Sequence, residues 1–202
     1  MANSEEVLAF WFGASPNEGA PAPARMDLWF RGGKEVDETI RRRFGDDTER
    51  ARRGELHDWA ASARGRLALI VLLDQFSRNL YRGSAEAFAK DDVSLSLALE
   101  GLELGHDKQL SSIEQLFFVL PLEHSEDLAM QDRMVDYMNA WAEGVAEALK
   151  PVARGVREFA LQHRDVIARF GRFPTRNKAL GRTSTPEEEA HVREAGAAGR
   201  PV

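Results

Sequence analysis

The sequence predicts an all-α fold, and three observations carry this prediction. No stretch of the 202 residues keeps the alternating apolar pattern of a strand. Apolar residues instead recur every three or four positions in several segments, as they do on one face of a helix. Capping patterns stand at Asn3-x-x-Glu6, Ser111-x-x-Glu114 and Thr185-Pro186-Glu187-Glu188. We therefore expect about eight helices in antiparallel pairs, one domain over residues 1–195 and a flexible tail over 196–202.

The first part of the chain divides into short helices and one loop. We expect a helix from the Asn3 cap to Gly13, followed by a loop over 14–25 that holds three Pro. A helical turn over 26–30 comes next. A helix is then expected from about Lys34, and a further turn from Asp46 to Gly54. None of these segments carries a motif with an evident chemical role.

The helix expected over 66–81 is the most buried, because apolar residues cover most of its sides. Asp74 lies among these hydrocarbon side chains, four positions before Arg78, with which it is able to pair. A carboxyl group in such surroundings needs a charged partner or a proton. We therefore expect Asp74 either to hold the fold together through a buried ion pair or to be a site residue.

The second part of the chain continues with longer helices. They are expected over 93–104, over 113–120 with its end at Pro121, from the N-cap Ser125 through an apolar face that reaches Leu149, from Pro151 to the breaker Gly171, and from Thr185 to the tail. In the helix that begins at Pro151, one stripe is expected to face the core. It consists of Val152, Val156, Phe159, His163, Val166 and Phe170.

Composition narrows the class of protein. The chain has no Cys, so it has neither disulfides nor thiolate chemistry. It has no apolar run of the ~20 residues that a spanning helix needs, and its N-terminus is acidic where a secretory signal is basic. We expect a cytoplasmic protein without membrane contact. A net charge of −6 and a pI near 5.5 argue against general nucleic-acid binding.

Two histidines are candidates for chemistry. His124 and His163 both stand near carboxylates in the sequence, and with Asp74 either could form an acid–base pair. The same three residues could form a metal site of two His and one carboxylate, although no ligand spacing such as HExxH supports it. The alternative is that both are hydrogen-bonded core residues. We predict no metal and no cofactor.

A basic segment over 163–182 holds five Arg and one Lys against one Asp, so it needs an acidic partner. Internal pairing with Asp74, Glu123, Glu126, Asp127 and Asp132 is one possibility. The other is that some guanidinium groups remain unpaired and bind a phosphate or carboxylate. The sequence RNxxxG also occurs twice, at 78–83 and 176–181. The candidate ligand-binding residues are Arg78, Asn79, Arg82, Glu123, Glu126, Arg169, Arg172, Arg176 and Asn177.

Three long motifs resemble a known family. They are LLDQFSRNLYRG at 72–83, FFVLPLEHSEDL at 117–128 and HRDVIARFGRFPTRNKALGRTST at 163–185, and FWFG at 10–13 agrees with them. Over roughly residues 4–195 the chain resembles the bacterial domain of unknown function 924. The resemblance implies an all-helical fold similar to tetratricopeptide repeats, and no established activity. The family pattern often has His where this chain has Thr175, and Pro where it has Ser77. A mechanism that required a His before Arg176 could therefore not operate here.

The function remains open between three classes at this point. The first is a binding module whose Arg- and His-lined cleft accepts a small anionic ligand or an acidic peptide end. The second is a hydrolase-type enzyme with His124 or His163 as base, Asp74 or Glu126 orienting it, and Arg172 and Arg176 holding the substrate. The third is a scaffold without a pocket. The first two require the candidate side chains to meet at one place that water can reach.

Overall fold

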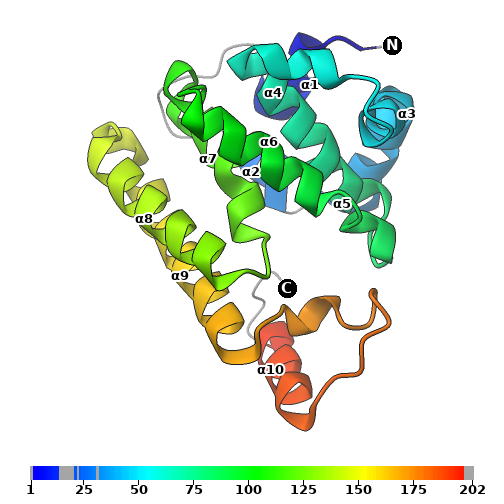
Figure 1. The fold of residues 1–202 in the computed structure, drawn as a ribbon, viewed down its shortest axis with the longest axis vertical. Coiled ribbons are helices and arrows are strands. Elements are labelled where there is room, and N and C mark those ends of the chain that lie inside the picture. The colour runs from blue at the N-terminus through cyan, green and yellow to red at the C-terminus, as the bar shows by residue number, and fades with distance from the viewer. Residues whose placement is uncertain (1, 14–20, 22, 31, 198–202) are drawn as a thin grey trace.

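A computed structural model describes residues 2–13, 21, 23–30 and 32–197. These residues form helices and short turns, without a strand among them, so the all-α prediction is confirmed (Figure 1). The helices are α1 (Ser4–Phe12), α2 (Pro23–Phe30), α3 (Gly33–Arg52), α4 (Ala63–Ile70), α5 (Ser77–Leu80), α6 (Asp91–Glu103), α7 (Ser112–Glu123), α8 (Leu128–Gly144), α9 (Lys150–Phe170) and α10 (Pro186–Ala197).

Short turns connect these helices. They are the 3₁₀ turns η1 (His57–Ala61), η3 (Ala85–Ala87), η4 (Asp107–Gln109), η5 (Glu147–Leu149) and η6 (Pro174–Arg176), and the π-helical stretch η2 (Val71–Phe76), which joins α4 to α5. The three predicted capping patterns at Asn3, Ser111 and Thr185 are present. At α10, for example, Glu188 accepts the Thr185 backbone N–H at 2.7 Å, and its own N–H reaches the Thr185 hydroxyl at 3.2 Å.

Several predicted boundaries are wrong. α2 begins at Pro23, inside the segment predicted as loop, and residues 14–20 and 22 of that segment lie outside the described residues. α3 is one continuous helix, so no new turn begins at Asp46. α10 continues through Ala197, two residues into the predicted tail, and 198–202 also lie outside the described residues.

The chain around Pro121 also differs from the prediction. α7 passes through Pro121 and ends at Glu123, because a proline removes only one backbone hydrogen bond and the later amides still bond; His124 N–H reaches Leu120 O at 3.0 Å. The N-cap of α8 is Asp127, whose carboxylate accepts from Ala129 N–H at 2.8 Å, and not Ser125.

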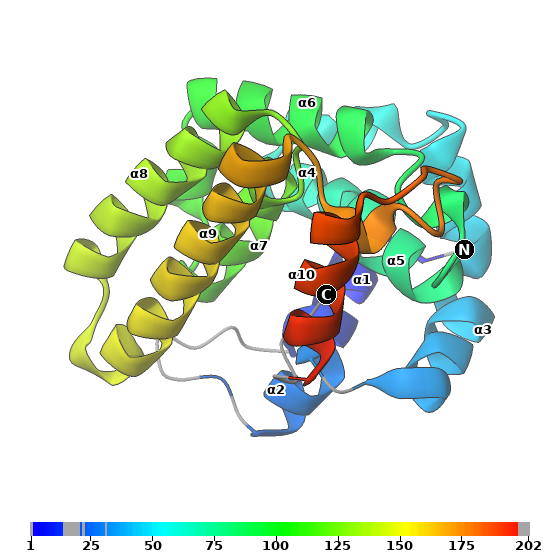
Figure 2. The same cartoon turned by 90° about the horizontal axis from the view of Figure 1, so that it is seen from below.

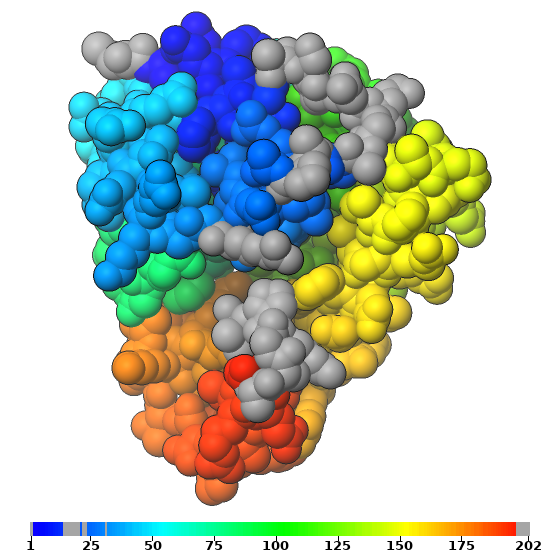
Figure 3. Space-filling model, turned by 180° about the vertical axis from the view of Figure 1, so that it is seen from behind, coloured from blue at the N-terminus to red at the C-terminus, as the bar shows by residue number. Residues whose placement is uncertain are grey.

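The segment from α4 to α5 forms the centre of the molecule, as predicted for 66–81. Six of its apolar side chains are fully buried, namely Leu67, Ala68, Ile70, Val71, Leu72 and Phe76. α1, α3, α6 and α7 surround this segment, whereas α8 and α9 form a separate antiparallel pair along one side (Figures 1 and 2). α10 lies close to the end of α9, and from behind the C-terminal segment forms one end of the molecule, next to α9 (Figure 3).

The predicted core face of α9 is wrong. The buried residues of this helix are Ala153, Ala160 and Ile167, spaced by seven positions. These side chains lie on the face that packs, while the stripe that contains Phe159 and His163 is only half buried, and Phe159 is 40% exposed. The helix ends at Gly171 as predicted, in a left-handed conformation with φ of 67°.

No helix within the described residues is both long and apolar enough to span a bilayer. The superhelical stacking that the resemblance implies stays a prediction.

The crossing of α6 over α4 and α7 yields a stability prediction. A Cβ at Gly101 would lie 2.3 Å from Phe118 Cζ and 2.6 Å from Arg66 Cδ, both of which are buried. We expect Gly101→Ala to lower the free energy of unfolding by about 1–3 kcal/mol, because the helices must separate. Urea unfolding measures this difference.

Gly155, in α9, is the matched control, since a Cβ there meets no atom of a neighbouring element within 4 Å in the described part of the chain. We expect Gly155→Ala to be neutral or to stabilise by up to about 1 kcal/mol, as the helix propensity of Ala exceeds that of Gly. Equal unfolding midpoints for the two variants would contradict the close crossing at Gly101.

Candidate functional site

Asp74 is the only carboxylate of the described residues whose side chain is fully buried, at 0% exposure, and it lies on the π-helical stretch η2. Such stretches widen a helix by one residue and occur frequently at functional sites. A buried carboxylate needs hydrogen bonds on both oxygens, so its partners define the site.

Three side chains satisfy Asp74. Oδ1 lies 2.7 Å from His124 Nδ1 and accepts from Arg78 Nη2 at 3.0 Å. Oδ2 accepts from the side-chain amide of Gln75 at 2.6 Å. Arg78 and Gln75 are neighbours of Asp74 on the same segment, whereas His124 is brought from the end of α7. The structure thus places two of the three predicted catalytic candidates, Asp74 and His124, in direct contact.

The backbone around His124 is held by a buried amide. His124 is the C-cap residue of α7, where the last carbonyl groups of the helix lack partners within it. Gln131 of α8 is 0% exposed, and its side-chain N–H groups donate to Glu123 O at 2.7 Å and to Ser125 O at 2.6 Å. These bonds hold the backbone carbonyl groups on both sides of His124 in place.

Two arginines meet at a second carboxylate, Asp91, the first residue of α6. Arg78 Nη2 donates to its two oxygens at 3.0 and 3.1 Å, and Arg176 Nη1 donates to Oδ2 at 3.1 Å. Arg176 also donates to the backbone oxygen of His124 at 2.8 Å. We call Asp74, Arg78, Asp91, His124 and Arg176 the Asp74 cluster.

Aromatic rings fix the guanidinium group of Arg176. It lies 4.8 Å from the centroid of Phe88 and 4.6 Å from that of Phe173, and Arg78 lies 5.3 Å from the same Phe88 ring. A cation over a ring face is attracted by the ring quadrupole. The two positive groups of the cluster are therefore stacked at one ring, at a half-buried position of the molecule.

Comparison with known proteins identifies the family. The sequence profile of a bacterial protein of unknown function, DUF924, matches residues 7–196. The chain belongs to DUF924. A solved structure of a protein of unknown function from Agrobacterium tumefaciens is similar to it, with 36% identity, a TM-score of 0.78, and coverage of 95% of this chain and 97% of that one. A comparison with functionally curated proteins gives no significant match.

In this DUF924 chain, other predicted site residues form a separate network. The Glu126 carboxylate accepts hydrogen bonds from Arg182 Nη1 at 2.7 Å and from the Phe173 N–H at 2.8 Å. Arg172 forms two bonds to Glu188, at 2.6 and 2.9 Å. The remaining predicted members of this region are tied in the same way: Asn177 bonds Ser184 and Glu188, and Arg169 bonds Glu187. Their carboxylates come mostly from α10, so this network fastens α10 to the segment after α9.

Arg82 and Asn79 do not join the Asp74 cluster. Arg82 forms two bonds to Asp37 of α3, at 2.9 and 3.1 Å. Arg82 and Asn79 line a cavity of about 310 Å³ between α3 and α5. Its other lining residues are Lys34, Asp37, Glu38, Arg41 and Leu80. The charges around this cavity are mixed, and Asp37 already occupies the guanidinium fork of Arg82.

His163 does not contact Asp74 either. Its Nδ1 donates to Phe159 O of its own helix at 2.9 Å and lies 3.7 Å from the Glu123 carboxylate, which is beyond hydrogen-bond distance. Its ring packs edge-on against Phe173, with centroids 5.6 Å apart. Among the described residues, no three His, Asp or Glu side chains gather closely enough to hold a metal ion.

Sequence reasoning named some ionic partners and missed others. The pairing of Asp74, Glu126 and Asp132 with arginines is present, but Asp127 caps a helix instead. Asp91, Glu188 and Gln131 were not predicted as partners. Asp91 carries a weak signal, since an acid at a helix start also favours the positive helix end. Gln131 is a single amide in a helix, and its role follows only from the fold.

Burial and neighbouring charges set the protonation of His124. Burial lowers its pKa to about 4, the positive charge of Arg78 contributes, and Asp74 opposes the shift only in part. His124 is therefore neutral at pH 7. Its Nδ1 carries the proton that it donates to Asp74, and Nε2 is left unprotonated as a potential base.

Burial and neighbouring charges also shift the pKa values of the other groups of the cluster. Burial tends to raise the pKa of Asp74, but His124 and Arg78 outweigh it, so this pKa lies below its usual value. Burial lowers the pKa of Arg176 to about 10, with a contribution from the charge of Arg78. Burial raises the pKa of Asp91 and of Glu123. At pH 7 Arg78 and Arg176 are positive, and Asp74 is negative.

These pKa shifts predict how acid destabilises the protein. The unfolded chain takes up a proton on His124 near pH 6.5, whereas the folded chain does so only near 4. Stability is therefore lost as the pH falls from 6.5 to 4, by about 3 kcal/mol from this one group. We expect His124→Asn, which keeps a donor near the Nδ1 position, to lose this part of the pH dependence.

The measurement is urea unfolding of both proteins between pH 4 and 8. His57, which is exposed on η1, provides the control through His57→Asn. Parallel stability curves for the wild type and His124→Asn over this range would show that burial does not depress the pKa of His124.

Proposed function

We propose that this DUF924 protein binds a small anionic ligand at the Asp74 cluster. The observation that carries the proposal is the meeting of two guanidinium groups, of Arg78 and Arg176, at the single carboxylate of Asp91, at 3.0–3.1 Å. Two neighbouring cations repel unless an anion lies between them. Asp91 provides that anion within the chain, and a carboxylate of a ligand has the same geometry.

Unused hydrogen-bonding atoms support the proposal. All hydrogen bonds of Arg78 use Nη2, so Nη1 has no partner among the described residues. Nε of Arg78 is buried without a hydrogen-bond partner. Among the described residues, Arg78 Nη1 and His124 Nε2 do not belong to this class of buried atoms without a partner. The side chains of Arg78 and His124 keep 20% and 17% exposure. Both could therefore contact a ligand from the solvent side.

The charge of the cluster favours a monoanion. With His124 neutral, the two arginines are balanced by Asp74 and by Asp91 to the extent that it is ionised. A bound carboxylate adds one negative charge, which a proton on His124 would compensate. Binding of a carboxylate should therefore strengthen at lower pH. Small organic acids and the carboxyl terminus of a peptide share this chemistry.

Asp91→Asn tests whether the cluster accepts anions. The change removes the internal competitor, so we expect small carboxylates to bind about tenfold more tightly than to the wild type, whereas Arg176→Lys should weaken binding about tenfold. Thermal melts with millimolar acetate, succinate and a free-carboxyl tripeptide, at pH 6 and 8, measure the change. Each variant is compared with its own ligand-free melt.

Arg133→Lys, an exposed position on α8, is the control and should bind as the wild type does. An Asp91→Asn protein that no carboxylate stabilises would mean that the two arginines serve only to hold the fold together. That outcome would favour the scaffold without a pocket.

A second function, a hydrolase-type enzyme, is favoured by one specific contact. The 2.7 Å bond between Asp74 and His124 Nδ1 orients the ring and leaves Nε2 able to take a proton. Glu126 and Arg172 are engaged by Arg182 and Glu188, so orientation and substrate binding would fall to Asp74 and Arg176. The substrate would be an ester with an anionic group.

Kinetics with chromogenic esters of small dicarboxylic acids tests this second function. With His124 as base, we expect a rate that is constant between pH 6 and 8, because the ring is already neutral there. His124→Asn should lower the rate by about 100-fold or more while carboxylate binding persists. Turnover that His124→Asn leaves unchanged would rule out His124 as the base.

A further inference from the structure

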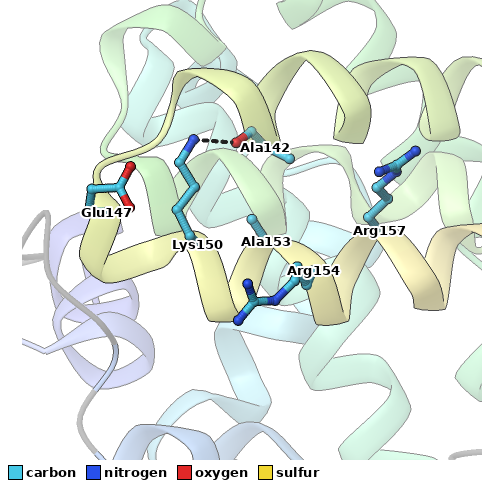
Figure 4. A pocket seen from close by; sticks show the side chains of 6 residues that line it. All are labelled: Ala142, Glu147, Lys150, Ala153, Arg154 and Arg157. Carbon is cyan, nitrogen blue, oxygen red and sulfur yellow. Dashed lines mark hydrogen bonds between the residues drawn. The ribbon is translucent and has the colours of Figure 1, made fainter.

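A second positively charged site lies on the opposite end of α9 from the basic segment. A cavity of about 280 Å³ opens between the last turn of α8 and the first two turns of α9 (Figure 4). Its lining residues are Ala142, Glu147, Lys150, Ala153, Arg154 and Arg157. Two of these are alanines, and the other four carry charged side chains that can contact a ligand.

Helix geometry brings three cations to this cavity. Lys150, Arg154 and Arg157 are spaced by four and three positions, which places them on one face of α9. Lys150 is anchored, since its ammonium group donates to Ala142 O at 2.9 Å and to Glu143 O at 3.0 Å (Figure 4). These are carbonyl groups of the last turn of α8, and two bonds leave one of the three ammonium donors unused.

The two arginines of the cavity differ from those described above. Arg154 and Arg157 are exposed, and they make no hydrogen bond, ion pair or ring contact with the described part of the chain. Arg78, Arg82 and the five arginines of the basic segment are each paired with a carboxylate. Among the described residues that line the cavity, Glu147 is the one acid. Three positive groups against one negative group leave an excess of two positive charges.

We infer that this cavity is a binding site for the dianionic phosphate of a small phosphomonoester. An excess of two positive charges matches a phosphate dianion, and a protein with net charge −6 otherwise repels one. Two guanidinium forks without a partner among the described residues and an anchored ammonium line the cavity, and each can donate to a phosphate oxygen. The cavity is larger than a phosphate ion, so it has room for part of the esterified group.

This site is independent of the Asp74 cluster. None of its lining residues belongs to that cluster, and its charge does not depend on a proton of His124. Phosphate binding at the cavity should therefore persist at pH 8, where phosphate is a dianion, whereas carboxylate binding at the Asp74 cluster should weaken there. The two sites can be separated by their variants.

Calorimetric titration of the full chain at pH 8 with inorganic phosphate and with glycerol 3-phosphate tests the inference. Sodium chloride keeps the ionic strength constant. For the wild type we expect one site with a Kd on the order of 0.1–1 mM for the ester. The double variant Arg154→Gln/Arg157→Gln should bind at least about tenfold more weakly.

The control is Arg42→Gln/Arg133→Gln, which removes the same charge from two exposed arginines that lack partners among the described residues. It should bind like the wild type. In nuclear magnetic resonance spectra, glycerol 3-phosphate should shift amides within residues 142–157 of the wild type. Amide shifts elsewhere only, or equal affinity of the wild type and the Arg154→Gln/Arg157→Gln protein, would overturn the inference. Equal weakening by both double variants would reveal unspecific attraction, and this also overturns it.

Discussion

The charge of one buried carboxylate, that of Asp74, constrains the architecture around it. A carboxylate at 0% exposure is costly unless each oxygen has a donor, and loss of one charged partner typically costs about 3–5 kcal/mol. The chain meets this need with side chains from η2, α5 and the end of α7. The positions of α5 and of the α7 end are thereby fixed relative to the central segment. Further out, Gln131 fixes the turn that carries His124, which ties α8 to the same point.

The basic segment at 163–182 finds most of its partners within the fold. Arg169, Arg172 and Arg182 are engaged by Glu187, Glu188 and Glu126, and these contacts hold α10 and the preceding loop in place. Arg176 differs, because it reaches across the molecule to Asp91 and shares that carboxylate with Arg78. The positive charge of this segment is thus mainly structural, and a ligand-binding role concentrates on Arg176. The difference between Arg176 and the other arginines of the segment depends on which acids lie near each of them in the fold. The charge composition of the sequence does not predict it.

The sequence predicted the fold well because helices depend on local patterns. The apolar periodicity of 66–81 and the caps at Asn3, Ser111 and Thr185 act within a few residues, as does the pairing of Asp74 with Arg78 four positions later. The orientation of α9 could not be derived, since periodicity identifies an apolar face but not which face the neighbouring helix covers. In α9 the small side chains of Ala153 and Ala160 are buried, whereas the larger side chains of the stripe that contains His163 stay half exposed.

The candidate site was predictable only in part, for the same reason. Asp74 stood out because an acid among hydrocarbon side chains has a high cost, and the family resemblance marked the segment around His124. Their contact spans 50 positions and follows from the arrangement of helices. Asp91 and Gln131 were missed because a helix-start acid and a mid-helix amide are common in any sequence. Conversely, the family motif that drew attention to Arg82 led to a residue that pairs with α3.

The link between Asp91 and Arg176 also bears on how the protein is made. The two residues are 85 positions apart, and Arg176 lies near the end of the chain. During synthesis the central helices emerge from the ribosome and can collapse long before Arg176 is added. Until then Phe88 and Asp91 lack the contacts that Arg176 makes with them. The segment that carries Arg176 therefore docks only after the central helices have been made, and a nascent chain stalled before residue 176 would leave Asp91 without its Arg176 partner.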